Sequence, residues 1–378
     1  MLKYIIFTII FIIPFNLFSQ SNSVRIEKGI DHIYHIKFDS AESEFKSIIA
    51  SDPDHPVGYF FLAMIDWWKI NLNKDKETFD EKFFKEVDKV VEVSEARLDK
   101  NEFDDEAMFY KGGALGYRGL VRSLRESWFK AAEDGKEALN LMQKAHEINK
   151  NNKDVIFGVG LYNYFAEYVP EAYPVVKPLM LIFPKGDKLK GLSQIKETSL
   201  NSRYAKNEAR FVLTYLNLVY EKNYVEAESY AKFLHEDFPE NPIFEKYLYS
   251  SYIGQAKWNE ALEGWKNVIE KIDSGRFGYN SDGLIRESNY YAALSLSKVN
   301  RILEAEPYIL RAENITNKMD KDEDHAYTSF IYLLAGMMND VKDNKSTADI
   351  YYDRVLSMKN FQNSHAEAEK FKRVRFRQ

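Results

Sequence analysis

The chain of 378 residues contains no cysteine. Disulfides, thiolate nucleophiles, iron–sulfur ligation and cysteine-based zinc sites are therefore all excluded. There is also no basic excess, because 52 Lys and Arg stand against 58 Asp and Glu for a net charge of -6, so no general field attracts nucleic acid. What the chain does have is 45% hydrophobic and 15% aromatic residues, enough to build a large core without covalent bridges.

The first residues have the pattern of a secretory leader. Lys3 precedes an apolar run from Tyr4 to Ile13, and the small residue Ser19 stands before Gln20. We expect residues 1–19 to be a signal peptide cleaved near Ser19/Gln20 and the mature chain to be exported to a bacterial periplasm. A membrane-spanning helix needs about 20 apolar residues, and this run is shorter. An uncleaved anchor in the inner membrane is therefore the second choice.

Beyond the leader, apolar residues recur with helical spacing and no alternating run of strand length competes. The pattern predicts an all-α chain. The clearest stripe lies on one face of a single helix and contains Trp258, Ala261, Leu262, Trp265, Val268, Ile269 and Ile272.

A longer period is superimposed on the helices. Ala227 and Ala261 are 34 residues apart, and each opens a second helix after a short turn. This spacing resembles the tetratricopeptide repeat family, whose small and large motif positions are matched in the first unit by Gly29, Ala41 and Phe45. The resemblance implies an α-solenoid of about eight helix pairs in a right-handed superhelical array.

The repeats are interrupted in the middle, where longer helices are expected near 79–98 and 128–149. From these features we expect a four-part chain after the leader. The parts are an N-terminal helical half (22–168), a proline-rich connecting loop (169–187), a C-terminal helical half (188–360) and a basic C-terminal helix or tail (361–378).

The segment from Tyr162 to Asp187 holds four of the ten prolines and predicts a break in the helices. It either caps a bend between the two halves or forms a lid over a groove. The stretch after it, with Gly186, Asp187, Gly191 and Leu192, resembles the eukaryotic family that includes the inclusion body clearance proteins. That resemblance implies shared architecture only.

Groove-facing positions on successive first helices are rich in aromatic residues, which are favoured at protein interfaces. The alternative is that these rings pack against the long helices or the proline-rich loop. The candidate partner-binding residues are Phe60, Met64, Trp67, Trp68, Tyr110, Tyr117, Arg118, Phe157, Leu161, Tyr164 and Phe165.

Polar clusters give no chemical signature. The row Arg118, Arg122 and Arg125 suits an acidic partner or a solvated face paired with neighbouring acids, and the pair His32 and His35 lacks further metal ligands. We therefore expect no cofactor, no metal and no catalytic residues. The basic C-terminus either docks on the acidic chain, remains a solubilising tail or contacts an anionic membrane.

These observations favour a non-catalytic, exported protein that binds a protein or peptide partner in the aromatic groove, as a scaffold or adaptor in a cell-envelope process. Two alternatives remain open at this stage. One is an envelope enzyme, or a binder of glycans or small ligands, whose groove the proline-rich loop closes. The other is a structural subunit of a secretion or assembly machine.

Overall fold

A computed structural model describes residues 13–172, 177, 183–320 and 324–378. Throughout these residues the regular structure is helical and contains no strand, as the sequence predicts. The chain divides into two compact units at Leu213, and each unit is an all-α solenoid of consecutive antiparallel helices. Among the described residues, no helix combines the length and apolarity needed to cross a membrane.

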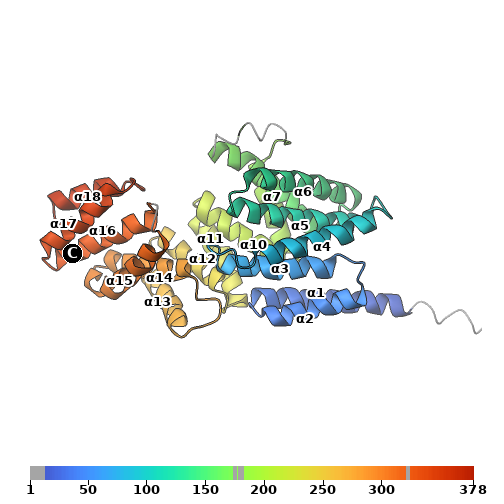
Figure 1. Ribbon diagram of the computed structural model, residues 1–378, viewed down its shortest axis with the longest axis horizontal. Helices are drawn as coiled ribbons and strands as arrows, with labels where there is room; N and C mark the ends of the chain where they lie inside the picture. The colour runs from blue at the N-terminus through green and yellow to red at the C-terminus, as the bar shows by residue number, and fades with distance from the viewer. Residues whose placement is uncertain (1–12, 173–176, 178–182, 321–323) are drawn as a thin grey trace, which may run out of the picture. The chain divides into compact units, whose positions relative to one another are not determined.

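The first unit is built from helices that pack on their sequence neighbours, while α1, α3, α5 and α7 also contact one another in that order (Figure 1). Its helices are α1 (Ile13–Tyr34), α2 (Phe38–Ser51), α3 (Val57–Leu72), α4 (Asp80–Leu98), α5 (Asp105–Leu124), α6 (Trp128–Ile148), α7 (Lys153–Ala172), α9 (Lys188–Asn201) and the first part of α10 (Lys206–Tyr215).

The second unit repeats this arrangement, with α12, α14, α16 and α18 in contact in that order and their partners packed beside them. Its elements are the π-helix η2 (Leu216–Tyr220), α11 (Tyr224–Asp237), α12 (Pro242–Gly254), α13 (Trp258–Asp273), α14 (Asp282–Lys298), the 3-10 turn η3 (Ile302–Ala305), α15 (Glu306–Met319), α16 (Ala326–Val341), α17 (Lys345–Ser357) and α18 (Ser364–Arg373).

The small and large positions of the repeat meet as the motif requires. A Cβ atom added to Gly29 would lie 2.4 Å from the Phe45 ring, and one added to Gly336 would lie 2.4 Å from the Tyr352 ring. Ala41 and Phe45 are fully buried. The helices of a pair therefore approach closely because a glycine or alanine on one helix makes room for an aromatic ring on the other.

Helix starts are fixed by side-chain caps, which accept hydrogen bonds from backbone N–H groups that have no partner within the helix. Asp104 accepts from Ala107 N and Asn223 accepts from Glu226 N. Asn241 accepts from Ile243 N at 3.0 Å, and the proline after it occupies the first turn of α12, where a missing N–H costs nothing. These caps define the short turns that keep successive helices antiparallel.

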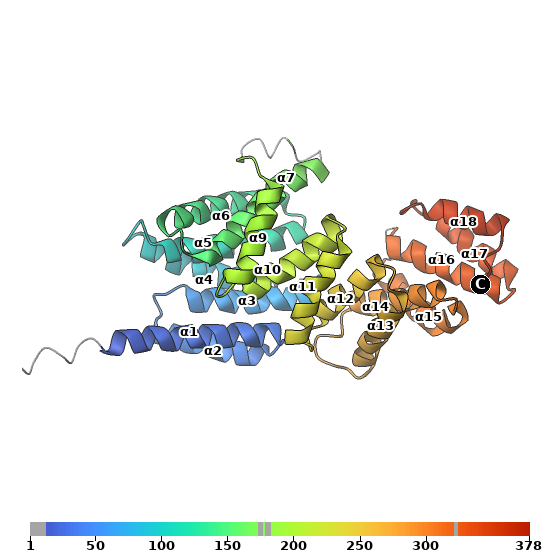
Figure 2. The ribbon, with the colours of Figure 1, turned by 180° about the vertical axis from the view of Figure 1, so that it is seen from behind.

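The proline-rich segment is shorter in the structure than the sequence predicts. Helix α7 continues to Ala172 and carries Pro170 in its last turn, so residues 169–172 are helical. The rest of the predicted loop lies largely outside the described residues, as do residues 1–12 of the predicted leader. Helix α9 follows the proline-rich segment but packs on α7, so it belongs to the first unit (Figure 2). The two compact units therefore divide after Leu213, whereas the sequence predicted a division at 169–187.

Candidate binding surfaces

The residues of the predicted aromatic groove lie on α3, α5 and α7, and α10 covers the part of this face formed by α3 and α5 next to α1. Phe211 of α10 packs against Trp68 with ring centroids 5.2 Å apart. The buried members of the predicted set are Phe60, Met64, Trp68, Tyr110, Phe157 and Tyr164. The half-buried members are Trp67, Tyr117, Arg118, Leu161 and Phe165.

Within this face the rings contact one another across neighbouring helices. The ring centroid of Phe60 in α3 lies 5.5 Å from that of Tyr110 and 6.3 Å from that of Tyr117, both in α5. The ring centroids of Trp67 and Tyr117 are 5.3 Å apart. Such ring pairs add about 0.5–1.5 kcal/mol beyond the area they bury. The rings therefore account for the stacking of α3 on α5, and partner binding by the half-buried members stays a prediction.

A buried carboxylate stands at the centre of this face. Glu208 of α10 accepts a hydrogen bond from the Tyr34 hydroxyl at 3.1 Å. Burial raises the pKa of Glu208 to about 7, although its interactions with Tyr117, Tyr34, Trp67 and Trp68 favour the charged form. The Trp67 indole nitrogen is itself buried and finds no acceptor at hydrogen-bonding geometry in the described part of the chain, so we take its effect on Glu208 to be electrostatic.

The arginine row of α5 is paired inside the protein. Arg118 and Arg122 both bind Asp134 of α6, at 2.7 Å and 2.6 Å, and Arg118 also reaches Asp88 at 2.8 Å. The Arg125 guanidinium binds the carboxylate of Asp80 at 2.6 Å. These arginines match the interpretation of the sequence in which they pair with neighbouring acids rather than with an external partner.

The glycine stretch after the proline-rich segment produces a close helix crossing. A Cβ atom on Gly191 of α9 would lie 2.5 Å from Tyr164 N and 2.6 Å from Gly160 O of α7. Asp187 caps α9 by accepting from Lys190 N, while its own N–H donates to Asn163 O at 3.0 Å. The short motif therefore has a structural use, since only glycine allows the two backbones to approach this closely.

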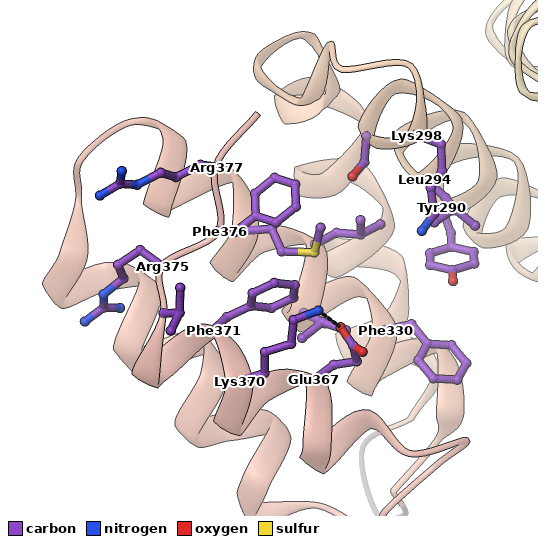
Figure 3. Close-up of a pocket in the computed structure, with 15 residues that line it drawn as sticks. Tyr290, Leu294, Lys298, Phe330, Glu367, Lys370, Phe371, Arg375, Phe376 and Arg377 are labelled. Carbon is purple, nitrogen blue, oxygen red and sulfur yellow. Dashed lines mark ion pairs between the residues drawn. The ribbon is translucent and has the colours of Figure 1, made fainter.

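A groove of about 750 Å³ lies in the second unit, with α16 as its floor and α14 and α18 as its walls. Figure 3 shows side chains from all three helices, and from the residues after α18, around one cavity. Its apolar lining comprises Tyr290, Leu294, Phe330, Leu333, Leu334, Met337, Phe371, Val374 and Phe376. Its polar and charged lining comprises Ser297, Lys298, Glu367, Lys370, Arg375 and Arg377.

The residues after α18 run back over the helices and form part of this groove. Arg375 binds Asp349 at 2.8 Å through both terminal nitrogens, and Phe376 N donates to Asp340 at 3.0 Å. The Gln378 side chain accepts from Ile302 N and donates to Ser297 O. The structure thus corresponds to the docking alternative for the basic C-terminus.

Sequence reasoning missed this groove. Its signals were present as helical stripes on α16 and α18, with Phe330, Leu333, Leu334 and Met337 on the former. The same spacing is expected of any core-facing helix, so it does not reveal which apolar positions stay uncovered. No cluster of metal-ligating side chains occurs among the described residues, and the pair His32 and His35 is no exception.

Comparison with known proteins adds three similar solved structures, all at low identity. Yeast Tom70 is 12% identical with 94% of this chain and 96% of that chain covered and a TM-score of 0.30. A tetratricopeptide repeat protein from Parabacteroides merdae is 14% identical with 94% and 99% covered and a TM-score of 0.28. A chain of the APC/C hetero-tetramer Cut9-Hcn1 is 11% identical with 91% and 82% covered and a TM-score of 0.31.

At these TM-scores the likeness carries no argument about what the chain binds or does. The assignment to an all-α solenoid therefore rests on the chain's own helices and their order of contacts. No family model and no curated protein matches the sequence.

Proposed function

We propose that the protein is a non-catalytic, exported scaffold that binds another protein in a cell-envelope process. The observation that carries the proposal is the contrast between two equivalent faces. In the first unit, α10 fills the face of α1, α3 and α5, whereas in the second unit the row of α14, α16 and α18 keeps an apolar groove. An uncovered apolar surface on a rigid helical array is typical of protein interaction sites.

Of the partner-binding residues predicted from the sequence, the proposal keeps only those that are half-buried. Leu161 and Phe165 of α7 are half-buried apolar members of the set, so part of each side chain is open to contact. Trp67 and Tyr117 are engaged with each other and with the surroundings of Glu208.

Export is the second element of the proposal and is supported by the leader-like pattern ahead of Gln20. The enzyme alternative has less support. An enzyme of this kind would be expected to bring several carboxylates together in an enclosed pocket. On the aromatic face, the buried carboxylate of Glu208 instead accepts a hydrogen bond from Tyr34 and joins α10 to α1.

The proposal is tested by capture of a partner with the purified mature chain from envelope extract of the source organism. We expect a partner that elutes with the chain as a stoichiometric complex in size-exclusion chromatography. The negative control is the same chain, immobilised in its unfolded state. If the folded chain retains no protein that the unfolded chain does not also retain, the scaffold proposal is contradicted. If the isolated chain unfolds at ambient temperature, the protein is instead an obligate subunit of a larger machine.

A further inference from the structure

The groove between α14, α16 and α18 has the dimensions of one face of a short helix. Its floor residues Phe330, Leu333, Leu334 and Met337 follow the spacing i, i+3, i+4 and i+7 on α16. Seven helical steps span about 10 Å, or two turns. The volume of about 750 Å³ lies within the range of about 300–1,000 Å³ typical of ligand clefts.

The two walls add further residues at helical spacing. On α14 the lining residues are Tyr290, Leu294, Ser297 and Lys298, and on α18 they are Glu367, Lys370 and Phe371. Tyr290 and Phe330 stack with ring centroids 6.2 Å apart, so the two helices form a continuous aromatic surface. The walls thus combine apolar side chains, from Tyr290, Leu294 and Phe371, with the charged side chains of Lys298, Glu367 and Lys370, and Figure 3 shows the Glu367–Lys370 pair beside Phe371.

The charged residues around the groove are mostly cationic, although the chain as a whole carries a charge of -6. Lys298 and Lys370 are both exposed, one on each wall. The single acid, Glu367, lies 3.8 Å from Lys370 in an exposed pair that holds the lysine weakly. Arg375 is held by Asp349, and its guanidinium points away from the cavity in Figure 3, as does that of Arg377.

From the apolar stripe and the lysine pair we infer that this groove binds an acidic, amphipathic helical segment of a partner protein. The guest places apolar residues at i, i+3 or i+4 and i+7 against Phe330 and Leu333, and its acidic residues flank them to meet Lys298 and Lys370. Charge complementarity selects this guest over a basic helix, because a basic helix would bring like charges together on both walls. The inference rests on the proposed scaffold function and names the partner chemistry.

The direct test measures binding of a labelled synthetic peptide to the purified full-length protein by fluorescence anisotropy. The probe is an acidic amphipathic helix with Leu at the anchor positions. One comparison peptide has the same composition in scrambled order, and another has Lys in place of every Glu. We expect the first peptide to bind, and we expect added salt to weaken it. Equal binding of the scrambled peptide, or tighter binding of the Lys peptide, would overturn the inference.

Variants locate the binding on the protein. The double variant Lys298→Glu and Lys370→Glu removes the cationic pair, and we expect it to raise the Kd at least about tenfold at low salt. Its matched control is Arg373→Glu with Lys345→Glu, which reverses two exposed cations of the same unit that do not line the groove. If both double variants weaken the peptide equally, the groove is not the site.

A second pair of variants tests the apolar anchor. Phe330→Ala removes a half-buried ring of the floor and should weaken the peptide about fivefold or more. Phe277→Ala removes an exposed ring of the same unit away from the groove and should leave the Kd unchanged. Since Phe330 is only half-buried, both variants should retain the helical circular dichroism of the parent, and an unaltered Kd in Phe330→Ala refutes the anchor.

Other occupants give distinct results. Binding to phosphatidylglycerol vesicles that the lysine variant abolishes, without any binding of the acidic peptide, assigns the groove to a membrane surface and overturns the inference. Dimerisation in light scattering that the same variant abolishes assigns it to a second copy. If envelope partners are still captured by the lysine variant while no peptide binds, the inference fails and the proposed function stands.

Discussion

Glu208 and Tyr34 are joined by a buried hydrogen bond of 3.1 Å across 174 residues of sequence. The bond ties α10 to α1 and places Phe211 of the same helix against Trp68 of α3. Because the carboxylate lies in a desolvated site, its protonation state is coupled to the folding of the first unit.

The pH dependence of stability should reveal this coupling. The pKa of Glu208 is about 7 when folded and 4.5 in the unfolded reference, so between these values the native state binds the extra proton. The free energy of unfolding should therefore fall as pH rises from 5 to 7, by on the order of 3 kcal/mol in total. Glu208→Gln should remove this slope in urea unfolding followed by circular dichroism.

The control for that measurement is Glu92→Gln, which changes an exposed glutamate paired with Lys89. It should leave the slope as it is in the parent. Tyr34 and Tyr117 do not contribute in this window, because burial raises both pKa values well above 10. Parallel slopes in the parent and in Glu208→Gln would show that the buried carboxylate does not titrate in the way its surroundings require.

Glycine at the crossing of α7 and α9 should be indispensable. In Gly191→Ala the new methyl group would meet backbone atoms of Tyr164 and Gly160, which cannot move without shifting α7. We expect a loss of about 1–3 kcal/mol in the free energy of unfolding. Gly135→Ala on α6 meets no atom within 4 Å and should instead stabilise the protein by about 0.5–1 kcal/mol. A neutral Gly191→Ala would contradict the crossing.

Asp134 should be the critical acid of the arginine row. Its side chain is 4% exposed and binds both Arg118 and Arg122, so Asp134→Ala leaves two neighbouring guanidiniums without their shared carboxylate. We expect a loss of about 3 kcal/mol in chemical denaturation. Glu92→Ala breaks an exposed pair and should change stability by less than about 0.5 kcal/mol. Similar small effects for the two variants would mean that the cluster is solvated.

Export predicts a processed N-terminus. Mass spectrometry of the protein recovered from its native host should show a chain that begins at Gln20, in the periplasmic fraction. The opposite outcome is an intact chain that sediments with membranes and is released by detergent, which identifies an uncleaved anchor. A double variant with Asp in place of Ile9 and Ile10 should keep the protein in the cytoplasm, because it interrupts the apolar run.

Much of the fold could be predicted from local patterns. The 34-residue spacing of Ala227 and Ala261 identified the helix pairs, and Gly29 with Phe45 identified a small and a large partner that do meet. These features depend on residues close in sequence, so periodicity reveals them.

The binding surfaces could not be predicted in the same way. That α10 covers the aromatic face depends on contacts between residues far apart, such as Glu208 with Tyr34, and a buried Glu on a helix looks in sequence like any exposed one. The groove on α16 was missed because its residues look in sequence like buried core residues. Leu333 and Phe330 follow the stripe of a core-facing helix, and only the arrangement of α18 beside them leaves these side chains half open.

Helix α18 also covers an apolar surface of the helix before it. Ala368 and Phe371 of α18 pack on the apolar side of α17, where Phe371 meets Tyr352, while Glu369 and Arg373 are exposed. Helix α18 therefore hides an adhesive apolar surface of α17 from solvent and from other molecules.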